Sequence, residues 1–197
     1  MQTGYFGPTL ARNAPQKPSF GSVISRSLGA RQAEMPAYVT VPKSEAFGYQ
    51  NAVYLGKSYN PFEVGGNPNE KDFKVPNLSP PESLTLKSVG ARRKLLRAFD
   101  TLRRDIDSSG VLEGLDTFKA QALNMVAGES VRKAFDIQSE EAALRDKYGR
   151  HQFGQSALLA RRLVEAGCRC VTINTGYWDH HNDIEKGLED LLPPLDR

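Results

Sequence analysis

Four side chains able to do chemistry follow one another near the C-terminal end of the chain. They are Trp178, Asp179, His180 and His181, so two of the three histidines and the only tryptophan share one short stretch. A carboxylate oxygen and an imidazole nitrogen are good ligands for zinc or another divalent metal. The Asp-x-His spacing therefore makes this stretch a candidate metal site. The alternative, a turn aspartate beside a surface histidine, stays open, because a closed site needs three or four ligands.

Other catalytic patterns are missing from the sequence. It has no G-x-S-x-G, Walker A, G-x-G-x-x-G, H-E-x-x-H or C-x-x-C motif, and it identifies no catalytic nucleophile. His151 is interpreted as a surface or helix-capping residue. Cys168 and Cys170 are two apart in a predicted strand, where their side chains are parallel and badly placed to bridge each other. We interpret both as small buried apolar residues.

The elements that would position the candidate site are a helix, a strand and a further helix. From Gln155 the apolar side chains have helical spacing and Gly167 ends the helix, with Arg161 and Arg162 on the opposite side. The apolar positions are Leu158, Leu159, Leu163 and Val164. A strand is predicted over 168–174 and a second helix over 184–192. The loop between them leaves the carboxyl end of a strand, where α/β proteins bind ligands.

The N-terminal part predicts the same alternation of helix and strand. Phe20, Val23, Ile24 and Leu28 define the apolar face of a helix that begins after Pro18-Ser19 and ends at Leu28-Gly29. A short strand follows over 38–42. The fold class expected is α/β.

Two long segments separate these elements. Residues 43–81 are rich in glycine, proline and aromatic side chains, which predicts an ordered loop anchored by its aromatics, either a rim of the site or a packed connection. Residues 88–148 predict a helical insertion with helices over 88–107, 115–127, 131–135 and 142–148. Ser139 and the two following glutamates would cap the last helix. The basic residues of this insertion are expected to form a solvated face.

Composition excludes some classes of protein. The net charge of +3 over 197 residues is small and dispersed, so nucleic acid is not an expected partner. No apolar run approaches the ~20 residues that span a bilayer. The N-terminus lacks the apolar segment of a secretory signal.

Several consecutive motifs resemble the domain-of-unknown-function 1501 family, and the resemblance covers essentially the whole chain. The matching segments read PSFGSVISRSLG, MPAYVTVP, YNPFEVGGNPN, YGRHQFGQSALLARRLVEAG and YWDHH. The family is placed with the alkaline-phosphatase/sulfatase superfamily. The resemblance therefore implies a doubly wound α/β sheet, and divalent metal ions (zinc, calcium or similar) that assist hydrolysis of phosphate or sulfate esters. The expected substrate is a small-molecule or glycan ester.

The resemblance also implies particular ligands. The family's W-D-x-H motif falls on Trp178, Asp179 and His181, which makes Asp179 and His181 the expected metal ligands, with His180 as the alternative. Family members carry further ligand motifs before and after the matching region. We therefore expect 1–197 to be a single incomplete domain, an internal fragment inactive alone, from a full-length protein that is exported or periplasmic. The alternative function is a non-catalytic scaffold that binds a ligand or partner.

Overall fold

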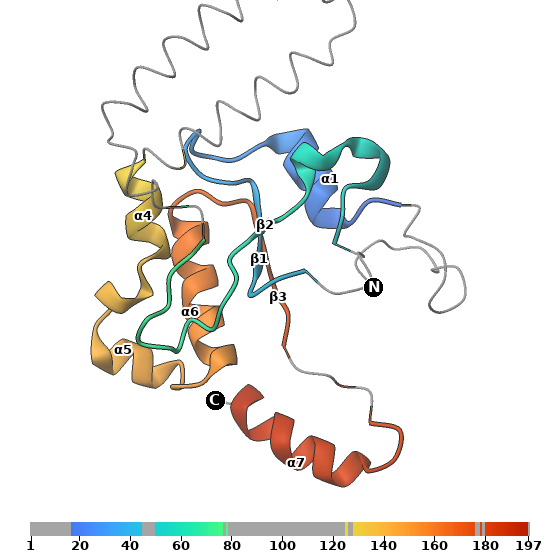
Figure 1. Ribbon diagram of the computed structural model, residues 1–197, viewed down its shortest axis with the longest axis vertical. Coiled ribbons are helices and arrows are strands. Elements are labelled where there is room, and N and C mark those ends of the chain that lie inside the picture. Colours follow the sequence, from blue (N-terminus) through green and yellow to red (C-terminus); the bar gives the residue numbers. More distant parts are fainter. Residues whose placement is uncertain are drawn as a thin grey trace, which may run out of the picture.

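A parallel three-stranded sheet forms the centre of the molecule. The computed structural model describes residues 17–44, 50–76, 78, 125, 128–175, 178 and 180–196. Strands β1 (Tyr38–Val41), β2 (Phe62–Glu63) and β3 (Cys170–Ile173) lie in the order β2-β1-β3 (Figure 1). Both pairings are parallel, and Val39 lies between Phe62 and Val171. The α/β class predicted from the sequence is confirmed.

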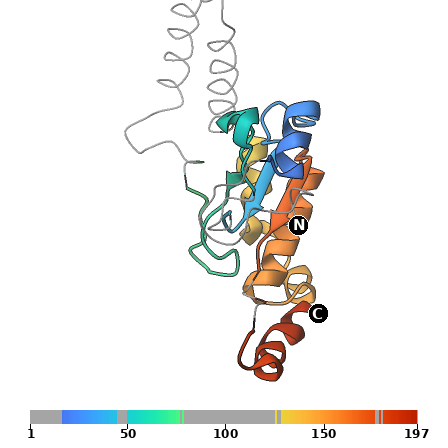
Figure 2. The same cartoon turned by 90° about the vertical axis from the view of Figure 1, so that its right-hand side faces the viewer.

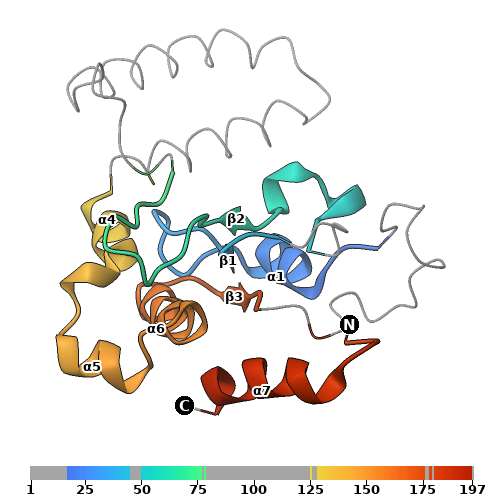
Figure 3. The ribbon, with the colours of Figure 1, turned by 60° about the horizontal axis from the view of Figure 1, so that its bottom comes forward.

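Helices cover both faces of this sheet (Figure 3). The helices are α1 (Phe20–Leu28), α4 (Glu129–Phe135), α5 (Ala142–Lys147), α6 (Gln152–Glu165) and α7 (Ile184–Leu195). Alternate residues of β1 serve the two faces, as the period of a strand requires. Val39 and Val41 belong to the apolar core on the α6 side, whereas the ring of Tyr38 lies against α1. None of these helices is long and apolar enough to cross a membrane.

The core on the α6 side follows the predicted helical spacing. Leu158, Leu159 and Leu163 are fully buried and pack with residues of β1, α4 and the chain near β2. Val164, the fourth predicted position, is exposed. Gly167 follows the helix at a φ of 113°, a left-handed conformation that favours glycine and turns the chain into β3.

Helix α1 forms where it was predicted but buries the opposite face. Its N-cap is Ser19, whose side chain accepts a hydrogen bond from the Ser22 amide. Phe20, Val23 and Leu28 are 48%, 44% and 60% exposed, whereas Gly21, Ser22 and Ser25 are buried. A Cβ at Gly21 would lie 2.5 Å from the Tyr38 ring. The predicted apolar face of α1 is therefore wrong. The helix instead turns its small residues toward the sheet, because only small side chains allow it to pack this close to Tyr38.

The 43–81 segment contains a strand that its composition did not predict. Two 3-10 turns (Val53–Leu55 and Lys57–Tyr59) precede β2, which pairs with β1. Phe62 stacks edge-on against Phe135 with ring centroids 5.7 Å apart, and Phe73 packs on the core. Tyr54 is exposed. Aromatic anchoring therefore holds for Phe62 and Phe73 but not for Tyr54.

Only part of the predicted 88–148 helical insertion can be compared with the structure. The helices predicted over 88–107 and 115–127 fall outside the described residues, apart from Met125. Those predicted over 131–135 and 142–148 are α4 and α5. Glu141 occupies the N-cap position of α5, as predicted, but its side chain makes no capping hydrogen bond. Ser139 does not cap the helix and instead donates to the Asp136 carbonyl.

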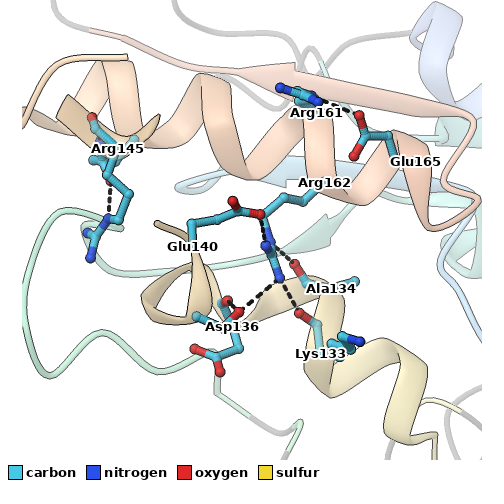
Figure 4. A network of polar contacts seen from close by, with 10 residues as sticks. Lys133, Ala134, Asp136, Glu140, Arg145, Arg161, Arg162 and Glu165 are labelled. Atoms are coloured by element: carbon cyan, nitrogen blue, oxygen red, sulfur yellow. Dashed lines mark hydrogen bonds and ion pairs between the residues drawn. The ribbon is translucent and has the colours of Figure 1, made fainter. Parts of the chain in front are cut away.

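Two arginines, Arg145 of the predicted insertion and Arg162 of α6, are packed inside the helical layer (Figure 4). Arg145 is only 6% exposed, and its Nε and Nη1 donate to the side-chain oxygens of Gln155 and Gln138 at 2.7 and 2.6 Å. Burial lowers the pKa of Arg145. The Arg162 side chain is 13% exposed and forms an ion pair with Glu140. The predicted solvated face is wrong for Arg145, because Gln155 and Gln138 from neighbouring segments supply its buried hydrogen-bond partners.

Candidate functional site

The candidate loop begins where β3 ends. Residue Asn174 follows the strand directly, and Asp183 caps the start of α7 by accepting a hydrogen bond from the Lys186 amide. In Figures 1 and 2 the chain runs from β3 past the carboxyl edge of the sheet to α7. Strand β1 is the central strand, with β2 on one side and β3 on the other. The carboxyl ends of parallel strands are where α/β proteins form ligand sites.

His180 is held against helix α7. A Cβ at Gly187 would lie 2.4 Å from the His180 ring, so the imidazole occupies the space that a larger residue would fill. Its Nε2 is buried and has no hydrogen-bond partner among the described residues. A buried polar atom without a partner is uncommon in a folded protein and needs an explanation. Sequence analysis did not single out Gly187, which lies seven residues after His180.

The other predicted ligands have different settings. Asp179 lies outside the described residues. His181 is described and exposed, and it interacts with another group. The expected ligand pair of Asp179 and His181, with His180 as the alternative histidine, stays a prediction. The Trp178 indole N–H donates to the carbonyl of Thr175 at 3.1 Å, which ties the middle of the loop to its beginning.

The base of the loop rests on a pair of side-chain amides. Gln50 Nε2 donates to Asn174 Oδ1, and Asn174 Nδ2 donates to Gln50 Oε1, both at 3.0 Å. Asn174 Nδ2 also lies 2.5 Å from the Lys43 carbonyl and 3.3 Å from the Thr40 hydroxyl. Gln50 and Thr40 are fully buried. Neither amide was singled out by the sequence, where they stand far apart.

The donor atoms fit part of a metal site. A carboxylate and imidazoles suit zinc and similar divalent ions, and the unpartnered Nε2 of His180 is a nitrogen with coordinating capacity to spare. Within the part of the chain that the structure describes, no group of three or more His, Cys, Asp or Glu residues could hold a metal. The metal site expected on this loop therefore stays a prediction.

The remaining histidine has a structural role. His151 is the N-cap of α6, and its Nδ1 accepts a hydrogen bond from the Gly154 amide at 3.2 Å. This confirms the helix-capping interpretation made from the sequence.

The two cysteines are buried and free, as interpreted from their spacing. The Cys168 thiol lies 3.2 Å from the Cys170 carbonyl and 3.6 Å from that of Ala37. Burial raises the pKa of Cys168 to about 12 and also raises the pKa of Cys170. Both thiols therefore stay protonated at neutral pH and pack as small side chains.

This burial predicts an alkaline loss of stability. The unfolded chain releases the Cys168 proton near the ordinary pKa of 9.0, well below the folded value of about 12. The contribution of the buried Cys168 thiol to folding stability is therefore fully present below pH 9, and it is lost as the pH rises toward 12. We expect urea unfolding to show about 1 kcal/mol less stability at pH 10 than at pH 8 from this group. In Cys168→Ala that decrement should be absent; an equal decrement in both proteins would contradict the assignment.

Comparison with known proteins gives one match. The family model described as "Protein of unknown function (DUF1501)" matches residues 1–197. No curated protein and no solved structure matches the chain.

Proposed function

Because the chain belongs to the DUF1501 family, we propose that it is part of a metal-dependent hydrolase of phosphate or sulfate esters. In this proposal the loop between β3 and α7 supplies one half of the metal site through Asp179 and a neighbouring histidine. The substrate is a small-molecule or glycan ester.

The observation that carries the proposal is the setting of His180. Its Nε2 is buried without a partner among the described residues, on a loop that leaves the carboxyl end of β3, and the adjacent residue is a carboxylate. Gly187 leaves room for the ring, so the imidazole is held by the fold rather than extended into solvent. These features favour His180 as a ligand, whereas the spacing Asp179-x-His181 favours His181.

The proposed roles follow from the donor atoms. A divalent metal, when bound, stabilises the negative charge that develops on the attacking and leaving oxygens of an ester. Asp179 supplies a hard carboxylate oxygen and lowers the net positive charge of the ion. The histidine supplies a neutral nitrogen and must be deprotonated to do so, so metal binding should weaken at acidic pH.

Metal analysis with single substitutions tests the ligand assignment. We expect the 197-residue chain to bind Zn²⁺ in competition with a chromophoric chelator. Asp179→Ala should weaken that binding, as should one of His180→Ala and His181→Ala, because each removes a donor from an already incomplete set. The histidine whose removal leaves the affinity unchanged is not a ligand. Unchanged affinity in all three variants would remove the loop from the site.

Activity assays distinguish the proposal from the scaffold alternative. For residues 1–197 alone we expect almost no hydrolysis of p-nitrophenyl phosphate or sulfate, because the described residues lack a complete ligand set. Metal-dependent hydrolysis by this chain would show that its other residues complete the site. The gene should be read on both sides of this segment for further ligands and a nucleophile, and its whole product assayed. A product that binds metal but hydrolyses neither ester would favour a non-catalytic scaffold.

A further inference from the structure

The reciprocal amide pair of Gln50 and Asn174 joins the carboxyl end of β3 to the segment between β1 and β2. It joins residues 124 positions apart, and each side-chain amide both donates and accepts. Asn174 is the residue at which the chain leaves β3, and its main-chain N–H donates to the Val41 carbonyl at 2.8 Å. Two contacts therefore hold Asn174 in position: its main chain bonds to β1, and its side chain bonds to Gln50.

Gln50 is itself held from a third direction. Its main-chain carbonyl accepts hydrogen bonds from the hydroxyls of Ser19 and Ser22 at 3.0 and 3.3 Å. These serines begin α1 and are fully buried. The amide pair therefore connects the start of α1, the end of β1 and the end of β3. Buried polar groups with all partners present specify one arrangement of the chain, because any shift leaves a donor or acceptor unsatisfied.

We propose that Gln50 and Asn174 are positioning residues that fix where the loop bearing Asp179, His180 and His181 leaves the sheet. The loop begins one residue after Asn174, and the Trp178 indole is bonded back to Thr175. A displaced Asn174 would carry Thr175 and Trp178 with it and move the histidines relative to α7. The inference rests on the proposed function for its metal readout but not for its conformational one.

The single tryptophan makes the conformational test direct. Because Trp178 is the only tryptophan in the chain, its fluorescence reports on this loop alone. Gln50→Leu removes the buried amide with little change in volume, and Asn174→Ala removes the half-buried partner. Gln155→Leu is the matched control, because Gln155 is an equally buried amide whose partners are Arg145 of α5 and Gly149 of the turn after α5 rather than residues of the loop.

Both pair variants should shift Trp178 emission to the red and raise its quenching by acrylamide, while the control keeps the wild-type values. Their Zn²⁺ affinity should fall about 10- to 100-fold, the usual effect of removing a group that orients a ligand. The double variant should lose no more Zn²⁺ affinity than the single variant with the larger loss, because the two residues act as one unit. Asn174→Ala keeps the test informative if Gln50→Leu does not fold.

The outcomes separate the two proposals. Wild-type emission and quenching in both pair variants, or an equal change in Gln155→Leu, would overturn the positioning role. If the wild-type chain does not bind Zn²⁺ but Trp178 responds as expected, the metal function fails and the positioning role stands. If Zn²⁺ binds wild type, the pair variants and the control equally, the positioning role fails and the proposed function stands.

Discussion

Replacing Gly154 with alanine is expected to destabilise the protein by about 3 kcal/mol or more. Gly154 lies in the first turn of α6, where the turn after α5 crosses the helix. A Cβ there would lie 1.8 Å from the Tyr148 carbonyl oxygen and 2.7 Å from that of Gly149. Both atoms belong to the backbone, so the overlap cannot be relieved by a side-chain rotation. Chemical denaturation monitored by circular dichroism measures the loss.

The opposite change on the same helix is the control. Ala157→Gly removes a half-buried Cβ and should cost about 1 kcal/mol through helix propensity. A Gly154→Ala protein no less stable than Ala157→Gly would mean that α5 and α6 separate without cost.

Replacing Arg162 with methionine should cost about 2–4 kcal/mol, the second large effect. The guanidinium pairs with Glu140, and its Nε and Nη2 donate to the carbonyls of Ala134 and Lys133 at 3.1 and 2.5 Å. Methionine retains much of the aliphatic packing but leaves the carboxylate and both carbonyls without this donor. Urea unfolding of the variant measures the difference.

Arg161→Met is the neighbouring control. Arg161 pairs with Glu165 one turn along the same helix, and both side chains are largely exposed. Solvent screens this pair, so its loss should change stability little. Equal effects of the two substitutions would show that the contacts of Arg162 with α4 and Glu140 contribute no more than a surface pair.

The sequence alone predicted the features that depend on neighbouring residues. The spacing of Leu158, Leu159 and Leu163 predicted the buried face of α6, because helical period and burial coincide there. Ser19 and Gly29 marked the ends of α1 through local capping. Consecutive motifs along essentially the whole chain identified the family. Each of the two helix signals is contained within a few consecutive residues.

Only the tertiary structure decided the features made by distant residues. Burial of the small side of α1 depends on Gly21 meeting the ring of Tyr38. Strand β2 is short and polar on one side, and it is a strand only because β1 offers hydrogen bonds. The burial of Arg145 requires the amides of Gln138 and Gln155. No periodic pattern in the sequence indicates which residues form these contacts.

The candidate site divides in the same way. Residue types and order predicted Asp179 with His181 or His180 as donors, since ligand chemistry belongs to the side chain itself. Only the tertiary structure shows that the His180 ring packs against Gly187 and that Gln50 pairs with Asn174 at the base of the loop. The physical reason is that a side chain's chemistry is set by its own atoms, whereas its position is set by contacts between segments that only folding brings together.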